Sequence, residues 1–203
     1  DTGVDPHPDL RNNLLPGTDS YPGGKGNGQV DTVGHGTRMA GLVAAHGRSG
    51  NAGALGIAPK AKILPIRYVK SKGTNDPDDI ATGIDFAVSN GAQVINISSE
   101  ASPTPRLREA VEAAINKDVV IVAGVGNSSS ILVGFPAAYE NVVAVTATNR
   151  SGSHADFAVT GPEVVISAPG VDLPTTSPNG GYGPSTGTSP ATAIVAGAAA
   201  LVR

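Results

Sequence analysis

The sequence predicts a single α/β domain in which a mostly parallel central sheet is flanked by helices. Beyond residue 62, short runs rich in valine and isoleucine alternate with amphipathic stretches, which is the pattern of βαβ units around a buried parallel sheet. Segments rich in Gly, Pro, Asn and Ser separate these runs and predict loops. With 203 residues, the chain is long enough for one well-buried core and short for two domains.

The first strand and helix of this series are expected at residues 63–69 and 77–89. Asp76 is a favourable N-cap residue, and Pro77 suits the first helical position. Apolar residues recur every four positions through this helix, and Gly91 just beyond it is a natural left-handed stop.

A second strand and helix follow the same plan, with a strand at residues 94–98 and a helix that begins after Thr104. Residues 12–31, rich in Gly, Pro, Asn and Asp, predict a long surface loop. The nearly all-apolar segment 189–203 predicts a buried helix, because its length falls short of the roughly 20 residues of a membrane span. Further strands are expected at residues 119–125, 142–146 and 164–168.

Composition excludes several function classes. The formal charge is −3, and Lys and Arg form no cluster that would neutralise a row of phosphates, so we expect no nucleic-acid partner. The absence of cysteine rules out disulfides and thiolate chemistry. No apolar run is long enough to span a membrane. A nucleotide-binding α/β domain is disfavoured because no Gly-rich phosphate loop follows a strand.

Three short strings combine a reactive side chain with glycine: they contain Asp1, His35 and Ser189, in that order along the chain. Each string alone also fits a tight turn. A serine hydroxyl needs an adjacent base to act as a nucleophile at neutral pH, and imidazole titrates in the right range. A carboxylate on the other ring nitrogen would hold one tautomer and stabilise the imidazolium. A packed core histidine is the alternative for His35, and core or surface roles are expected for His7, His46 and His154.

Several motifs occur in register along the chain: Asp1-Thr2-Gly3-Val4, His7-Pro8-Asp9-Leu10, Gly34-His35-Gly36-Thr37, Gly56-Ile57-Ala58-Pro59, Val94-Ile95-Asn96-Ile97-Ser98, Gly126-Asn127 and Gly187-Thr188-Ser189. On these motifs, and over essentially its whole length, the sequence resembles the subtilase family of serine proteases. The resemblance implies a three-layer subtilisin-like fold and a serine endopeptidase that works through an acyl-enzyme, with Asp1, His35 and Ser189 as its triad and Asn127 as oxyanion donor. For Asn127, a simple turn residue is the alternative. The segment 192–198 is similar to actinobacterial secreted subtilases, including mycosins.

The resemblance also implies how a peptide would bind, as an added strand between two extended segments. Glu100 stands where the family usually has glycine; its charge would favour basic substrate residues, and a solvated loop charge is the alternative. The substrate-binding residues implied are Gly73, Thr74 and Asn75 on one side, Ser98, Ser99 and Glu100 on the other, and Gly124, Val125 and Gly126 in the first specificity pocket.

No cofactor or metal is expected for the chemistry. Asp9 matches a position that ligates calcium in many relatives, with carbonyls from residues 50–54, but one carboxylate is a weak basis for a cation that takes six or more oxygens.

The pattern departs from the family at Asp1, which relatives reach at the end of a central strand, and at Pro190, where they mostly carry a larger apolar residue. We therefore expect residues 1–203 to be a catalytic domain truncated at both ends. These departures motivate an alternative function, a catalytically impaired scaffold that binds protein. The resemblance further implies a peptide or protein substrate, an N-terminal propeptide, and a secreted or cell-surface location.

Overall fold

The computed structural model describes residues 1–48, 52–69, 76–127 and 132–203. Its centre is a parallel sheet with the strand order β5-β6-β7-β8. The register pairs Ile95 with Ile121 and Ala123 with Ala144, so the strands run side by side over their apolar centres. The four strands are β5 (Val94–Ile97), β6 (Val120–Gly124), β7 (Val143–Thr148) and β8 (Ile166–Pro169).

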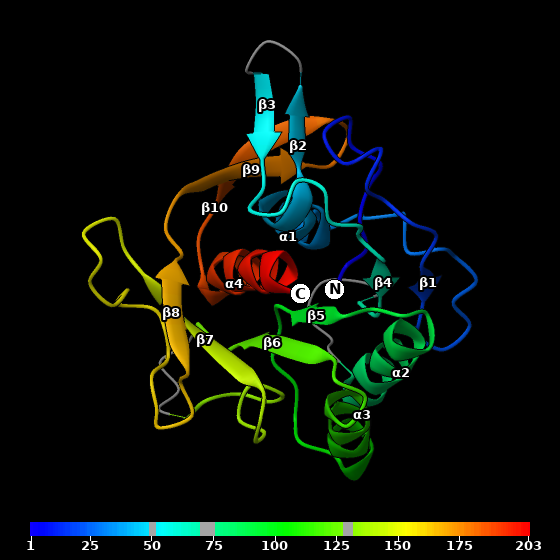
Figure 1. The fold of residues 1–203 in the computed structure, drawn as a ribbon, viewed down its shortest axis with the longest axis vertical. Helices are drawn as coiled ribbons and strands as arrows, with labels where there is room; N and C mark the ends of the chain where they lie inside the picture. The colour runs from blue at the N-terminus through cyan, green and yellow to red at the C-terminus, as the bar shows by residue number, and fades with distance from the viewer. Residues whose placement is uncertain (49–51, 70–75, 128–131) are drawn as a thin grey trace.

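Helices cover both faces of this sheet and give the three expected layers (Figure 1). On one face, α2 (Pro77–Ser89) packs beside α3 (Pro105–Ile115) and forms the larger core with the sheet. On the other face, α4 (Thr188–Val202) packs against the strands and against α1 (His35–Ala44). The α/β fold with a parallel sheet and flanking helices is therefore confirmed.

The cap residues place the two outer helices where the sequence predicts them. The Asp76 carboxylate accepts a hydrogen bond from the Asp78 N–H at 2.9 Å, and the Thr104 hydroxyl accepts one from the Leu107 N–H at 3.1 Å. Gly91, just after α2, has φ +76°, a left-handed conformation that glycine adopts without strain.

Several strands differ from the expectation. The strand predicted at residues 63–69 is reduced to β4 (Ile66–Arg67), which pairs with β1 (Thr18–Asp19) inside the predicted loop 12–31. Two antiparallel hairpins were not expected, because their segments carry Gly and Pro and their pairing depends on packing against α1. They are β2 (His46–Arg48) with β3 (Ala52–Leu55), and β9 (Leu173–Ser177) with β10 (Gly181–Ser185).

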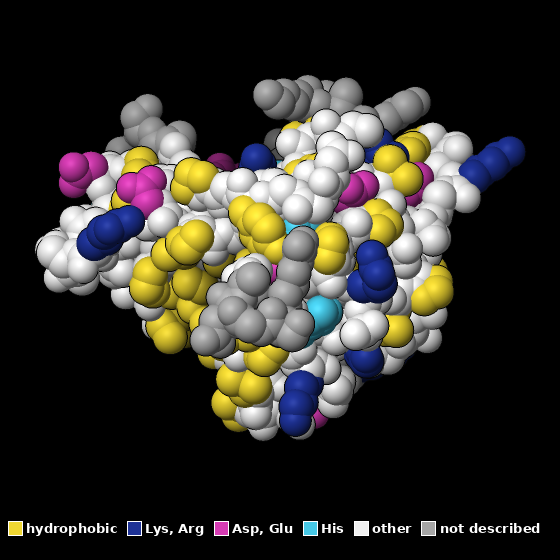
Figure 2. Space-filling model, turned by 90° about the horizontal axis from the view of Figure 1, so that it is seen from above, with side chains coloured by type: hydrophobic (Ala, Val, Ile, Leu, Met, Phe, Trp, Pro, Cys, Tyr) yellow, Lys and Arg dark blue, Asp and Glu magenta, His cyan; other side chains and the backbone are white. Residues whose placement is uncertain are grey.

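The last helix is buried only in part. Residues near its start, such as Ala191 and Ala193, are fully buried, whereas Leu201 and Val202 in its last turn are exposed. Within the described residues, no helix is long and apolar enough to cross a bilayer. On the face drawn in Figure 2, Lys and Arg side chains lie singly among hydrophobic and polar ones.

Candidate active site

A cleft of about 410 Å³ opens where β5 and β6 end and α4 begins. Ligands of parallel α/β sheets bind outside the carboxyl ends of the strands, because loops there project over the sheet edge. Three of the expected catalytic side chains, which are as much as 188 positions apart in sequence, line this one cleft. The lining residues are Asp1, Thr2, Val33, His35, Tyr68, Val69, Ser98, Ser99, Glu100, Gly124, Gly126, Asn127, Thr188 and Ser189.

The Asp1 carboxylate holds the His35 ring. Nδ1 of His35 lies 2.9 Å from both Oδ1 and Oδ2 of Asp1. The Thr2 N–H donates to Oδ1 at 2.6 Å, which fixes the carboxylate in turn. Because a carboxylate only accepts hydrogen bonds, Nδ1 must carry the proton, and Nε2 of the neutral ring is then left as the base.

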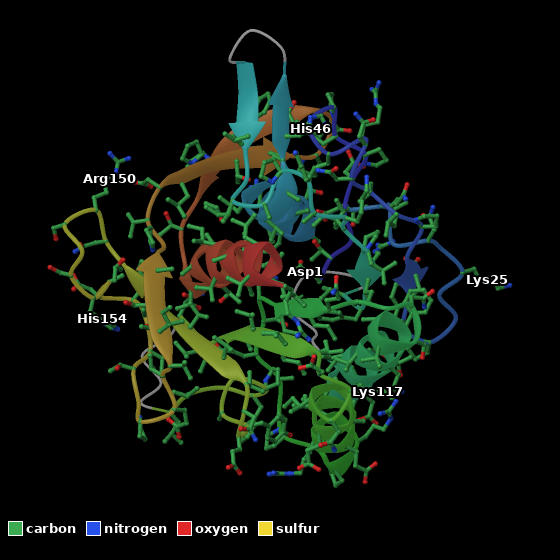
Figure 3. The ribbon with its side chains drawn as sticks, in the orientation of Figure 1. Asp1, Lys25, His46, Lys117, Arg150 and His154 are labelled. Atoms are coloured by element: carbon green, nitrogen blue, oxygen red, sulfur yellow. The ribbon has the colours of Figure 1, made fainter. Side chains whose placement is uncertain are left out.

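Backbone contacts place Asp1 at the middle of the molecule, between α1, α4 and β5 (Figure 3). Its carbonyl oxygen accepts hydrogen bonds from the N–H groups of Tyr68 at 3.0 Å and Val69 at 3.2 Å. His35 is the first residue of α1, after Gly34 with φ +90°. The backbone of Asp1 is held by residues 68 and 69, and His35 is held in the first turn of α1. These two placements bring the carboxylate and the imidazole together.

Asp31, which the sequence analysis did not single out, connects the N-terminal segment that carries Asp1 to the start of α1. Its buried carboxylate accepts five hydrogen bonds, from the Thr2 hydroxyl, the N–H groups of Val33 and Gly34, and both the N–H and the hydroxyl of Thr37. The Thr2 hydroxyl also accepts from the Gly36 N–H at 2.9 Å. The available signal was an aspartate three residues ahead of Gly34 at a helix start, a common capping arrangement.

Ser189 is held at the start of α4 by reciprocal hydrogen bonds with Ser98, which follows β5. Oγ of Ser189 donates to the Ser98 carbonyl, and Oγ of Ser98 donates to the Ser189 carbonyl, both at 3.1 Å. Among the described residues, the Ser189 hydroxyl makes no hydrogen bond to His35. Catalytic hydrogen bonds often form only when substrate is bound. Rotation about the Cα–Cβ bond of Ser189 would redirect its hydroxyl into another staggered position.

Asn127 lies just beyond β6, in contact with the first residue of α4. Its Oδ1 accepts the Thr188 N–H at 2.6 Å, which orients the amide so that Nδ2 is available as a donor. The Ser189 N–H lies in the first turn of α4, where backbone N–H groups lack helical partners. These two donors border the same cleft as the Ser189 hydroxyl.

The expected substrate-binding residues fall into three groups. Ser98, Ser99, Glu100, Gly124 and Gly126 line the cleft. Val125 does not, because its side chain is fully buried in the core on the α2–α3 face, so its expected lining role is corrected. Gly73, Thr74 and Asn75 lie outside the described residues.

Tyr68 is a cleft residue that the sequence analysis did not single out. Its hydroxyl lies 2.5 Å from the Ser99 hydroxyl, and burial raises the pKa of Tyr68 to about 12. The phenol is therefore neutral across the physiological range and joins the two sides of the cleft by a neutral hydrogen bond.

The remaining histidines have other surroundings. His7 is buried, its Nδ1 accepts the Asp9 N–H, and its Nε2 lies 2.9 Å from the carbonyl oxygen of Gly181, so it connects the N-terminal segment to the first residue of β10. His46 and His154 lie at the periphery, far from Asp1 (Figure 3). The core or surface roles expected for them match these positions.

Asp9 is fully buried, and its Oδ2 accepts hydrogen bonds from the Ala54 N–H at 2.7 Å and the Tyr182 hydroxyl at 2.8 Å. Residues 50 and 51 of the expected calcium loop lie outside the described residues. Among the residues that are described, no three His, Cys, Asp or Glu side chains cluster as metal ligands. Calcium binding stays an untested expectation.

Burial also affects the base itself. It lowers the pKa of His35 from the usual 6.5 to about 4. A base must be neutral to accept a proton, so the His35 ring is in its reactive form throughout the neutral and alkaline range.

Comparison with known proteins gives the family. The model of the subtilase family matches residues 1–203. The chain is 40% identical over 204 residues to Subtilisin Savinase from Lederbergia lenta, covering all of this chain and 74% of that protein. The chain belongs to the subtilase family. It is thereby a member of a family of serine endopeptidases.

Other relatives agree with this assignment. An alkaline protease from Alkalihalobacillus alcalophilus is also 40% identical, and the chain spans 52% of its length. The solved structure of Sphericase superposes with a TM-score of 0.89 at 34% identity, covering all of this subtilase chain and 74% of that one. A cold-adapted subtilisin-like serine proteinase superposes with the same TM-score at 30% identity. The subtilisin-like fold expected from the resemblance is confirmed, and the finer likeness to mycosins stays a prediction.

Proposed function

We propose that this subtilase hydrolyses peptide bonds with Ser189 as nucleophile, His35 as general base and Asp1 as the carboxylate that orients the base. The observation that carries the proposal is the Asp1–His35 hydrogen bond at 2.9 Å in the same cleft as Ser189. The impaired scaffold, the alternative function, has no support from the relatives, whose names are those of proteases.

The proposed reaction runs in two halves. The Ser189 hydroxyl attacks the peptide carbonyl while Nε2 of His35 takes its proton, and Asp1 stabilises the imidazolium. Asn127 Nδ2 and the Ser189 N–H donate to the resulting oxyanion. His35 then protonates the leaving amine, which departs and leaves an acyl-Ser189 ester. Water repeats the attack with His35 again as base, so that a carboxylic acid and the free enzyme are released.

This chemistry uses only protein groups, and we expect no cofactor in it. Peptide or protein chains are the proposed substrates, bound along Ser98, Ser99 and Glu100 and along Gly124 and Gly126, which border the cleft. An N-terminal propeptide and a secreted or cell-surface location are proposed from the family resemblance alone. Incubation with a chelator tests the cofactor expectation: acylation that vanishes with EDTA and returns with calcium would contradict it.

A fluorophosphonate probe tests the nucleophile directly, because it forms a stable ester only with an activated serine. We expect the full-length protein to be labelled at Ser189, and the label to be lost in Ser189→Ala and reduced at least about a thousandfold in rate in His35→Ala. Ser153→Ala, which changes an exposed loop serine, is the matched control. A wild-type protein whose Ser189 stays unlabelled would favour the scaffold function instead.

A further inference from the structure

The cleft contains a carboxylate that the proposed chemistry does not use. Glu100 follows β5 and lines the cleft together with Gly126, Asn127 and Ser189. The Asp1 carboxylate is hydrogen-bonded to the His35 ring, and Glu100 is the other acidic residue among the described residues that line the cleft. This second carboxylate therefore lies in the same cleft as the proposed nucleophile.

Two glycines determine how the Glu100 side chain lies. A Cβ added to Gly134 would lie 2.8 Å from Glu100 Cγ, and a Cβ added to Gly126 would lie 2.1 Å from Oε1. The stem therefore rests on Gly134 and the carboxylate on Gly126. Gly126 has φ +112°, a conformation that favours glycine, so its backbone leaves the room that the carboxylate occupies.

This position relates the carboxylate to one particular substrate residue. Gly126 directly precedes Asn127, the proposed oxyanion donor. The substrate residue that supplies the attacked carbonyl is called P1. Its side chain is attached to the Cα atom, which is bonded directly to that carbonyl carbon. The family resemblance implies that the first specificity pocket, which takes the P1 side chain, includes Gly124 and Gly126, and Glu100 lines the same cleft beside Gly126.

Among the described cleft residues, the side chains that carry a full charge at neutral pH are negative. Of the lining residues that the structure describes, none is Lys or Arg, and Asp1 and Glu100 are the acidic ones. We propose that Glu100 makes this subtilase select substrates with Arg or Lys at P1. The inference rests on the proposed function, and it adds the substrate class to it.

The size of the selection follows from the chemistry of the pair. A hydrogen bond to a charged group is roughly twice as strong as one between neutral groups. An interfacial charge pair discriminates chiefly against partners that leave one charge unmatched. Arg can engage a carboxylate through two parallel hydrogen bonds, whereas Lys offers one point charge. We therefore expect roughly a ten- to hundredfold advantage of Arg over an uncharged residue of similar length, with Lys between them.

The test uses the full-length protein and peptides that differ only at P1: Arg, Lys, norleucine and Ala. We expect kcat/KM for Arg to exceed that for norleucine by about ten- to a hundredfold. Glu100→Gln keeps the volume and removes the charge, so the Arg-to-norleucine ratio should fall to within about threefold while the rate with norleucine is retained. Glu112→Gln is the matched control and should keep the wild-type ratio. Glu112 is an exposed residue of α3 that pairs with Arg108 at 3.9 Å.

Two results would overturn the inference. One is an unchanged Arg-to-norleucine ratio in Glu100→Gln. The other is a preference for Ala over both longer side chains in the wild type and in Glu100→Gln alike, because Glu100 would then act through its bulk.

Binding to Ser189→Ala separates this inference from the proposed function. If fluorescence anisotropy shows that this variant binds the Arg peptide more tightly than the norleucine peptide while the wild type cleaves neither, the proposed function fails and the selection stands. Equal binding of the two peptides, with cleavage by the wild type, would refute the selection alone.

Discussion

Replacing Asp31 by asparagine should destabilise the fold and disturb the Asp1–His35 pair together. Three of the five donors to this carboxylate reach Oδ1 and two, both from Thr37, reach Oδ2. An asparagine offers one acceptor oxygen, so if it keeps the first set, its NH₂ group points at the Thr37 N–H. That N–H loses its partner, and the other bonds lose their charge assistance.

The magnitude follows from these counts. A buried donor left without a partner costs about 1–3 kcal/mol, and a bond to a charged acceptor is worth about 1 kcal/mol more than one to a neutral acceptor. The Thr37 hydroxyl oxygen already accepts the Asp5 N–H at 2.9 Å and has a second lone pair. By turning, the hydroxyl can therefore also accept a hydrogen bond from the new NH₂ group. We therefore expect Asp31→Asn to lower the free energy of unfolding by about 3–6 kcal/mol, a large part of a typical 5–15 kcal/mol.

Urea unfolding measures this loss, in a Ser189→Ala background that prevents self-digestion. Asp85→Asn is the control, because Asp85 is exposed and pairs with Arg106 at the surface, where an ion pair contributes at most about 1 kcal/mol. In the active background, Asp31→Asn should lower kcat more than it raises KM, since Thr2 and the start of α1 shift together. A loss of stability below about 1 kcal/mol with unchanged kcat would refute the role of Asp31 in connecting the Asp1 segment to the start of α1.

Three further predictions concern the cleft. Asn127→Leu should lower kcat about 10²- to 10³-fold with little change in KM, a magnitude known from a subtilisin of the same family, and Asn116→Ala on the outer surface is its control. Because burial lowers the pKa of His35 and the base must be neutral, the rate of Ser189 acylation should fall only as the pH drops well below 6.5; a midpoint at or above 6.5 would contradict this. Gly36→Ala would bring a Cβ to 2.1 Å from the Gly3 carbonyl oxygen and push α1 away from Asp1. We therefore expect it to lower the free energy of unfolding by about 1–3 kcal/mol or more and to remove most of the activity. Gly181→Ala is the control, because its Cβ would lie 3.4 Å from the nearest atom.

Local signals in the sequence determined the parts of the fold whose stabilising partners are close in the chain. Asp76 and Thr104 each cap a helix through a donor two or three residues later, so both outer helices could be placed at their first residue. The parallel strands β5 to β7 could be placed because buried strands are near-continuous apolar runs, whereas β8 is mostly exposed and begins two residues later than predicted. The order Asp1, His35, Ser189 indicated the chemistry, because acyl transfer by serine needs a base and a carboxylate.

Only the tertiary structure decided what depends on residues distant in sequence. The hairpin β9–β10 exists because hydroxyls of Thr175 and Thr176 bond to carbonyls of α1, about 137 and 139 positions away, which no local propensity reports. Asp31 acquires its role only when Thr2 and Thr37 converge on it. The hydroxyl of Ser189 bonds to Ser98 rather than to His35, a choice set by the approach of β5 to α4. Sequence determines local structure through short-range contacts, whereas a site built from several elements is decided by how those elements pack.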